Sequence, residues 1–398
     1  MKRIYRIFLI FTALAVLLSA AAGCGGEKES IETGELDLIH EEEFGGIYLK
    51  MTIDDFNALG FEYGDSVDVV FSNGYTLEDI PYYNGYYVEA GSPLLVAYPG
   101  YDYIKAAVNY GDDLWDTGML YAGKPVSVVS LWAEAKLEAH CKGKVILREK
   151  GKYRDIQISS DIHYTDVRTD YPSDEVFANF REVTCGDISE GVLYRSASPC
   201  DNRHERAPYV DGLMKEAGVK TILDLADTKE KIGSYIMMDS FPSVYFLEVW
   251  EKEGVIPLGL DMNFYSDSFR AKLADGLTVM AGKEGPYLVH CTEGKDRTGF
   301  VMMVLEALCG AGYEEIRDDY MLTYQNYYKI TKETEPEKYD IILSRNLDAM
   351  IRAVVGDESV DIYTADLSGY ARDYLVASGM SPEDVEALRD ALTGESGQ

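Results

Sequence analysis

The stretch Pro286–Phe300, "PYLVHCTEGKDRTGF", decides the fold of the second half of the chain. Its first residues are mostly apolar, as in a buried strand, and they run into Cys291. A short polar segment containing Gly294 follows, and Arg297 and Thr298 then open a long apolar run, as at the start of a buried helix. A strand, a glycine-containing loop and a helix in this order predict part of an α/β layer.

This loop combines residue types suited to binding and attacking a phosphate. The unpaired N–H groups and the dipole of a helix N-terminus bind anions, and they lower the pKa of a thiol placed there. Gly294 leaves room for the backbone to curl around an anion, and the planar guanidinium of Arg297 fits two phosphate oxygens. Thr298 can donate a hydrogen bond to a thiolate. The pattern predicts phosphoryl transfer through a cysteinyl-phosphate on Cys291.

The sequence "HCTEGKDRTG", His290–Gly299, resembles the signature of the protein-tyrosine phosphatase superfamily. It is most similar to the bacterial branch that also hydrolyses phosphoinositides. Other segments occur in the order that this branch shows: "NFREV" (179–183), "GVLYRSASP" (191–199) and "TILDLAD" (221–227). The resemblance covers about residues 155–395 and implies a cysteine-phosphatase fold, with a central, mostly parallel sheet flanked by helices.

The resemblance also implies the roles of the loop residues. Cys291 would be the nucleophile, and Arg297 would bind the phosphate. The other loop residues expected to contact the substrate or the cysteine are His290, Thr292, Glu293, Gly294, Lys295 and Thr298. Among them, His290 would lower the pKa of the cysteine, Thr298 would assist the leaving thiolate, and Lys295 would contact the substrate phosphate.

The general acid that protonates the leaving oxygen has more than one candidate. Asp296 lies in the loop and matches the aspartate proposed as the acid in the branch with Gly-Lys-Asp-Arg. Asp261 lies 291 − 261 = 30 residues before the cysteine, about where most of the superfamily keeps a mobile acid loop, although no Trp-Pro pair precedes it. Asp267 is a third choice. We favour Asp296, with Asp261 as the alternative.

Two departures from the branch bear on the substrate. Glu293 stands where phosphoinositide-active relatives usually have alanine, and Ala226 stands where they often have arginine. An added negative charge and a missing positive charge both disfavour heavily phosphorylated ligands. We therefore expect a preference for monophosphorylated substrates, phosphotyrosine above all, with phosphoserine, phosphothreonine or phosphoinositides as further substrates. The alternatives are an inositol-phosphate phosphatase of the cysteine-phytase type, and a surface ligand-binding lipoprotein in which the phosphatase domain is secondary. We expect no cofactor and no metal.

The N-terminus has the organisation of an export signal. A basic start precedes the apolar run Ile7–Leu18, and small residues then lead to Cys24. This order resembles a bacterial lipobox, which implies cleavage before Cys24 and its diacylation; a plain secretory signal is the alternative. We expect a signal peptide over residues 1–23, a flexible tether over 24–43, and a protein anchored in the cell membrane and facing outward.

Charge and cysteine content limit the partners. The formal net charge is −32, and removal of the three basic residues of the leader makes it about −35 (−32 − 3). A surface this acidic repels nucleic acid, so we expect no nucleic-acid partner. Six cysteines do not make a disulfide scaffold; Cys185 and Cys200 either pair or remain separate thiols.

Residues 44–150 are predicted to form a β-rich domain and a bridge, with the catalytic domain over 151–398. Asn84-Gly85, between two runs of tyrosine, predicts a hairpin. The order of glycines and strands resembles the small β-barrel domain of the S-adenosylmethionine hydroxide adenosyltransferases, which implies a fold and no such chemistry. The abundant tyrosines fit sheet packing better than a face for glycans or peptides. The mixed-charge segment 132–156 is expected to be the bridge.

Overall fold

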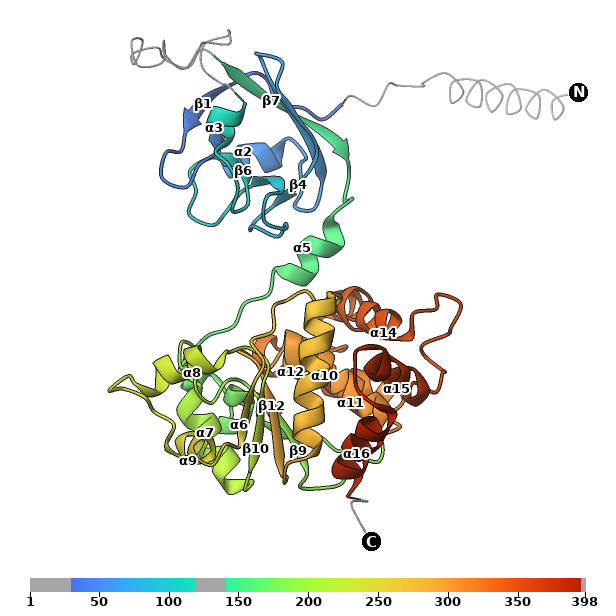
Figure 1. The fold of residues 1–398 in the computed structure, drawn as a ribbon. Helices are drawn as coiled ribbons and strands as arrows, with labels where there is room; N and C mark the ends of the chain where they lie inside the picture. Colours follow the sequence, from blue (N-terminus) through green and yellow to red (C-terminus); the bar gives the residue numbers. More distant parts are fainter. Residues whose placement is uncertain (1–29, 119–140, 395–398) are drawn as a thin grey trace, which may run out of the picture. The chain divides into compact units, whose positions relative to one another are not determined.

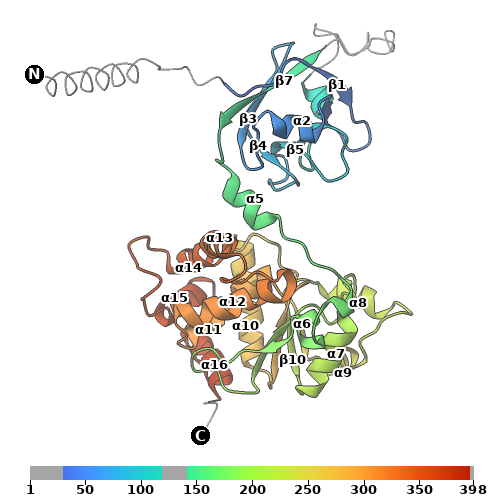
Figure 2. The same ribbon diagram turned by 180° about the vertical axis from the view of Figure 1, so that it is seen from behind.

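A computed structural model describes residues 30–118 and 141–394 (Figures 1 and 2). The chain divides into two compact units, Met1–Asp161 and Ile162–Gln398. The predicted signal peptide and its Cys24 lie outside the described residues. Within the described ranges, no helix has the length and apolar character needed to cross a membrane.

Unit 1 contains a closed seven-stranded barrel in the order β1-β2-β6-β5-β4-β3-β7. Its strands are β1 (Leu36–His40), β2 (Ile47–Leu49), β3 (Ser66–Phe71), β4 (Thr76–Tyr83), β5 (Pro93–Val96), β6 (Ile104–Val108) and β7 (Lys142–Glu149). Its described helices are α2 (Ile53–Ala58), α3 (Leu114–Thr117) and α5 (Arg154–Ser160). Alternation of side chains along each strand builds the core, as in β3, where Val67, Val69 and Phe71 are buried.

The limits of this unit differ from the prediction. The tether expected over residues 24–43 already contains β1, which pairs with β2 and β7. The bridge expected over 132–156 contains β7, which pairs with β3 along its whole length. A barrel closes only when its first and last strands are joined, so both segments belong to the barrel. The prediction took the mixed charge of this segment as a sign of a bridge. In the structure the charged side chains of β7 lie on the solvent-facing side of a strand.

The hairpin predicted at Asn84-Gly85 is wrong. β4 ends just before this pair, and the next strand, β5, pairs with β4 in parallel. A two-residue turn joins only antiparallel strands, so it cannot produce this pairing. The Asn84 side chain is instead held by the end of α5, because its Oδ1 accepts from Gln157 Nε2 at 2.6 Å and its Nδ2 donates to Asp161 Oδ2 at 2.9 Å. A tertiary contact thus replaces the local turn.

Unit 2 is built on a five-stranded sheet in the order β11-β10-β12-β9-β8. The first four strands in that order pair in parallel, and β8 pairs antiparallel with β9. The strands are β8 (Arg181–Glu182), β9 (Leu193–Ser196), β10 (Thr221–Asp224), β11 (Val255–Pro257) and β12 (Tyr287–His290). The α/β domain and the β-rich domain before it are therefore confirmed.

Helices cover both faces of this sheet, as Figure 1 shows. They are η1 (Arg168–Asp170), α6 (Asp174–Ala178), α7 (Ala207–Glu216), α8 (Lys229–Ile236), α9 (Val244–Glu251), α10 (Asp267–Ala281), α11 (Asp296–Leu308), α12 (Tyr313–Tyr328), α13 (Pro336–Ile342), η2 (Leu343–Leu347), α14 (Asp348–Val355), α15 (Ser368–Ala377) and α16 (Pro382–Thr393). On β12, Leu288 packs with α7 and α9, whereas its neighbour Val289 packs with α10 and α11. Because successive strand residues point to opposite faces, both faces of β12 are buried.

Candidate active site

Cys291 is the first residue after β12, and α11 begins five residues later at Asp296. The thiol is buried at the carboxyl end of the parallel strands, where α/β sheets bind their ligands. The loop between them ends at Lys295, the N-cap residue of α11. The strand, loop and helix predicted around Cys291 are therefore present.

Gly294 permits a close approach between the loop and β9. Its φ is +69°, and a Cβ atom there would lie 2.2 Å from the carbonyl oxygen of Ser196. The carbonyl of Gly294 accepts hydrogen bonds from Arg195 Nη2 at 3.0 Å and from Asn179 Nδ2 at 3.2 Å. A larger residue would therefore push the loop off the strand that holds it.

A buried ion network fixes Arg195 in turn. Its guanidinium pairs with Asp319, which also accepts from Arg181 Nε at 2.7 Å. Burial opposes ionisation of Asp319, but the guanidinium groups of Arg181 and Arg195 hold its pKa well below its usual range. Burial and the charge of Asp319 raise the pKa of the neighbouring Glu306 well above its usual range. Asp319 is thus the charged partner that keeps Arg195 under the loop.

Sequence reasoning did not single out these supporting residues. Asn179 and Arg181 stand in the "NFREV" segment and Arg195 stands in "GVLYRSASP", and both segments carry the family resemblance, so a signal for these three residues was present. Asp319 lies outside these two segments, and its role depends on contacts between distant parts of the chain.

Arg297 connects the loop with the segment after β11. Its Nη1 donates to the carbonyl of Leu260 at 2.9 Å, and its Nη2 donates to Thr292 Oγ1 at 3.2 Å. Its Nε is buried and has no hydrogen-bond partner in the described part of the chain. The guanidinium is thus held in place while its Nε–H remains unsatisfied. It can donate hydrogen bonds to an oxyanion without any rearrangement of the side chains around it.

His290 and Thr298 flank the cysteine and are both fully buried. His290 Nδ1 lies 3.2 Å from the carbonyl oxygen of Cys291, and its Nε2 lies 3.7 Å from Asp224 Oδ2. Burial raises the pKa of Asp224, and the nearby His290 opposes this rise. The Thr298 hydroxyl has no hydrogen-bond partner among the described residues, so it is available to a group on the loop.

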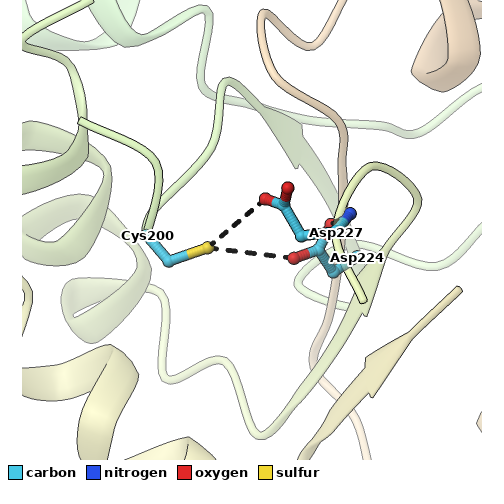
Figure 3. Close-up of side chains that lie close together, drawn as sticks. All are labelled: Cys200, Asp224 and Asp227. Atoms are coloured by element: carbon cyan, nitrogen blue, oxygen red, sulfur yellow. Dashed lines mark hydrogen bonds between the residues drawn. The ribbon is translucent and has the colours of Figure 1, made fainter. Parts of the chain in front are cut away.

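A second buried cysteine, Cys200, points toward Asp224 and Asp227 (Figure 3). Cys200 Sγ is 3.8 Å from Asp224 Oδ2 and 3.9 Å from Asp227 Oδ2. Burial and the two carboxylates raise the pKa of this thiol well above its usual range, so it stays protonated and donates to them. These three groups are close enough to hold a metal ion, but Asp227 also pairs with Lys231 at 2.6 Å. Cys200 and Cys185 are both free thiols in the structure.

The side chain of Glu293 is held beside the loop. Its Oε1 accepts from the hydroxyl of Tyr164 at 2.8 Å and lies 3.9 Å from His204 Nε2. Its backbone carbonyl accepts from the hydroxyl of Tyr327 at 2.8 Å. Tyr164 and Tyr327 stack on each other, with ring centroids 5.3 Å apart. The negative charge of Glu293 is therefore fixed in place, and sequence reasoning gave no sign of the two tyrosines that fix it.

Lys295 and Asp296 form an ion pair at the start of α11. Lys295 Nζ lies 3.0 Å from Asp296 Oδ1 and 5.9 Å from the centre of the Tyr324 ring. Burial disfavours the charged form of Lys295, but Asp296 and the surrounding tyrosines and Glu293 raise its pKa well above its usual range. The ammonium is therefore charged and partly engaged by Asp296.

The two other acid candidates lie after β11. Asp261 directly follows Leu260, whose carbonyl accepts from Arg297, so its backbone adjoins the residues that contact the loop. Its side chain is exposed, and its Oδ1 accepts from the Asn263 N–H at 2.9 Å. Asp267 is exposed at the first position of α10, where a carboxylate stabilises the helix dipole.

Comparison with models of protein families shows the family to which the chain belongs. The model of the tyrosine phosphatase family matches residues 175–394, and the chain belongs to this family. The predicted membership of the protein-tyrosine phosphatase superfamily is thereby confirmed, and the protein is a phosphoric monoester hydrolase. The match spans the sheet of unit 2 from β8 onward and includes every candidate catalytic residue discussed above.

Two solved structures are similar to part of the chain. The core catalytic domain of the PP-IP phosphatase SIW14 from S. cerevisiae is 19% identical, with 46% of this chain and 91% of that chain covered and a TM-score of 0.25. TpbA from P. aeruginosa is 18% identical, with 58% and 98% covered and a TM-score of 0.22. A search of curated proteins found no match.

We predict that Gly294→Ala lowers phosphatase turnover by about 100-fold, because the added Cβ displaces the loop from β9 and misplaces the thiol. The measurement is hydrolysis of p-nitrophenyl phosphate. Gly191→Ala is the matched control: Gly191 also has a positive φ, +75°, but a Cβ there meets nothing within 4 Å. Equal losses in the two variants would mean that backbone strain, and not the contact with Ser196, explains the glycine.

Proposed function

We propose that the protein hydrolyses protein phosphotyrosine through a cysteinyl-phosphate at Cys291. The observation that carries the proposal is the loop itself, which places a buried thiol at the end of β12, beside the N-terminus of α11 and its Arg297. The loop amides and the guanidinium would stabilise the charge on the equatorial oxygens in the transition state. His290 and Thr298 would favour the thiolate, as attacking group and as leaving group.

The reaction has two steps. In the first, the Cys291 thiolate forms a bond to phosphorus as the bond to the substrate oxygen breaks, and a carboxylic acid gives that oxygen a proton. In the second, water attacks phosphorus, the sulfur–phosphorus bond breaks, and the same carboxylate takes a proton from the water. The products are the free hydroxyl compound and inorganic phosphate, and the thiolate is regenerated.

The surroundings of the loop favour a singly phosphorylated substrate. Tyr164 and His204 hold the Glu293 carboxylate at the loop, and a fixed negative charge repels further phosphate groups. Lys295 is charged but shares its ammonium with Asp296. This charge arrangement favours a phosphotyrosine over an inositol polyphosphate.

Two exposed apolar side chains in the segment that follows Leu260 support the same choice. Met262 is 54% exposed and Tyr265 is 57% exposed, and both stand in the segment that begins after Leu260. The ring of a phosphotyrosine and the residues next to it in a peptide can cover these two side chains, whereas an inositol phosphate offers no comparable apolar surface.

A substrate panel tests the proposal. We expect the parent chain to hydrolyse phosphotyrosine peptides faster than phosphoserine peptides, phosphoinositides and inositol hexakisphosphate, and Cys291→Ser to lose at least ~1,000-fold in turnover. In Glu293→Ala, turnover of inositol hexakisphosphate relative to the peptide should rise by about tenfold, because one repulsive charge is removed.

The panel also separates the alternatives. Faster turnover of inositol hexakisphosphate by the parent would indicate a cysteine-phytase type of enzyme, and an inactive parent would indicate a ligand-binding protein with a silent phosphatase domain. An unchanged substrate ratio in Glu293→Ala would show that this carboxylate does not select against polyphosphates.

We propose Asp296 as the general acid, with Asp261 as the alternative. Asp296 is the first residue of α11, directly before Arg297 and five residues after Cys291, and its carboxylate pairs with Lys295 at 3.0 Å. Asp261 is exposed and lies next to Leu260, which contacts Arg297. Apo geometry alone does not exclude either residue, since catalytic contacts commonly tighten on substrate binding.

The pH dependence of kcat identifies the acid. In Asp296→Asn, we expect the alkaline limb of the pH profile, which reports loss of the acid's proton, to disappear, and turnover to fall most for substrates with poor leaving groups. Asp261→Asn is the matched variant and should keep that limb. The reverse result would assign the role to Asp261.

We further propose that the protein is a lipoprotein anchored through Cys24 on the outer face of the membrane, as the leader sequence supports. Cells producing the chain should incorporate radiolabelled palmitate into it, and Cys24→Ala should abolish the label. Equal labelling of the Cys24→Ala protein, or an unlabelled parent, would contradict the anchor.

A further inference from the structure

Unit 1 contains a cavity that has no part in the phosphatase site. Its volume is about 430 Å³, within the range of small-molecule pockets. The side chains that line it include an aromatic set and two polar groups: Phe44, Tyr86, Tyr101, Tyr110, Lys105 and Asn109. These residues come from the β1–β2 loop, from β6 and the residues after it, and from the segments on either side of β5.

Lys105 on β6 is a buried charge in the lining of this cavity. It is only 1% exposed, and its Nζ donates to Glu41 Oε2 at 2.7 Å. The ammonium also lies 5.7 Å from the ring centres of both Tyr48 and Tyr101. The strand neighbours of Lys105, Ile104 and Ala106, belong to the barrel core, so Lys105 points to the opposite side of the strand, toward the cavity. A buried ion pair contributes little net stability compared with apolar packing, so its presence there favours a role other than folding.

The β1–β2 loop packs closely against Lys105. Gly46 has a φ of +121°, and a Cβ atom there would lie 2.7 Å from Lys105 Cε. The same loop supplies Glu41, the partner of the ammonium, and Phe44, whose side chain is 79% exposed at the cavity. One short loop thus provides both the counter-charge of the cavity lysine and an aromatic ring in solvent.

Tyr110 provides a second exposed ring at the cavity. Its side chain is 93% exposed, and its φ is +46°, in the left-handed region that bulky residues rarely adopt. Such a conformation costs about 1–3 kcal/mol, and a side chain in solvent returns little packing energy to offset it. The conformation of Tyr110 therefore costs folding free energy that its side chain does not return. Strained residues of this kind are common at ligand-binding sites.

We infer that this cavity binds a neutral saccharide of one or two rings. The exposed rings of Phe44 and Tyr110 offer flat apolar faces, which suit the C–H face of a sugar. The hydroxyls of Tyr86 and Tyr101, 3.0 Å apart, and the Lys105 ammonium offer hydrogen bonds to sugar hydroxyls.

Other ligand classes fit this cavity less well. Glu41 already neutralises Lys105, and the chain carries a net charge of −32, so an anion would find no free positive charge in the pocket and an unfavourable field around it. An extended peptide commonly adds to an exposed sheet edge, and a closed barrel presents none.

Titration of the full chain with maltose, cellobiose and N,N′-diacetylchitobiose, followed by calorimetry and by saturation-transfer NMR, tests the inference. At least one disaccharide should bind with a Kd of about 1 mM or tighter. Tyr110→Gly should weaken that binding by about tenfold, because it removes an aromatic contact. The same variant should raise the Tm of the unit 1 transition, because glycine adopts a positive φ without strain. Tyr86→Phe should also weaken binding.

Leu59→Ala is the matched control, since Leu59 is an exposed apolar residue of the same unit outside the cavity. It should leave sugar binding unchanged, and phosphatase turnover should be the same in all these variants. The inference is overturned if no disaccharide binds at about 10 mM. Unchanged binding in Tyr110→Gly, or a lowered Tm in that variant, would also overturn it, the latter because it would give Tyr110 a structural role.

Discussion

The hydrogen bonds from Arg195 and Asn179 to the carbonyl of Gly294 are the contacts on which the catalytic loop depends. They tie the middle of the loop to β9 and to the end of α6, and the missing side chain of Gly294 lets the backbones of the loop and β9 meet. The loop lies between β12 and α11 and has no regular secondary structure of its own to hold it. Its shape must therefore come from outside, from two side chains of the neighbouring elements.

This anchoring explains why so much charge is buried beneath the site. Arg195 must be charged and immobile to hold a carbonyl, and burial of one guanidinium requires a carboxylate nearby. Asp319 supplies it and is shared with Arg181, while the adjacent Glu306 has a raised pKa. Two cations and one anion remain within hydrogen-bonding distance, so the network rigidifies the region without leaving an isolated charge.

The sequence was sufficient for features that depend on neighbouring residues. The strand before Cys291, the loop with Gly294 and the helix after it could all be predicted, because their residues are consecutive and each type has a local physical role. The contacts that hold the loop join residues 99 and 129 positions apart, Arg195 to Gly294 and Tyr164 to Glu293. No local pattern encodes such pairs, and they become visible only when the chain has folded.

The same limit explains the errors in unit 1. Asn84-Gly85 has the composition of a tight turn, but Gln157 and Asp161 bind the asparagine, and the chain continues into a parallel pairing. The preference of Asn-Gly for a tight turn amounts to at most ~1 kcal/mol, and two hydrogen bonds and a strand pairing together outweigh it.

Tyr164 connects the start of unit 2 with the catalytic loop. It is the third residue of unit 2, and its hydroxyl holds Glu293 in the loop that carries the nucleophile. The peptide segment that leaves unit 1 therefore continues, within three residues, into a direct contact with the catalytic loop. Ile162, two residues earlier, packs against the core of the same unit. Tension along that segment would therefore act on the core through Ile162 and on the catalytic loop through Tyr164 within the same three residues.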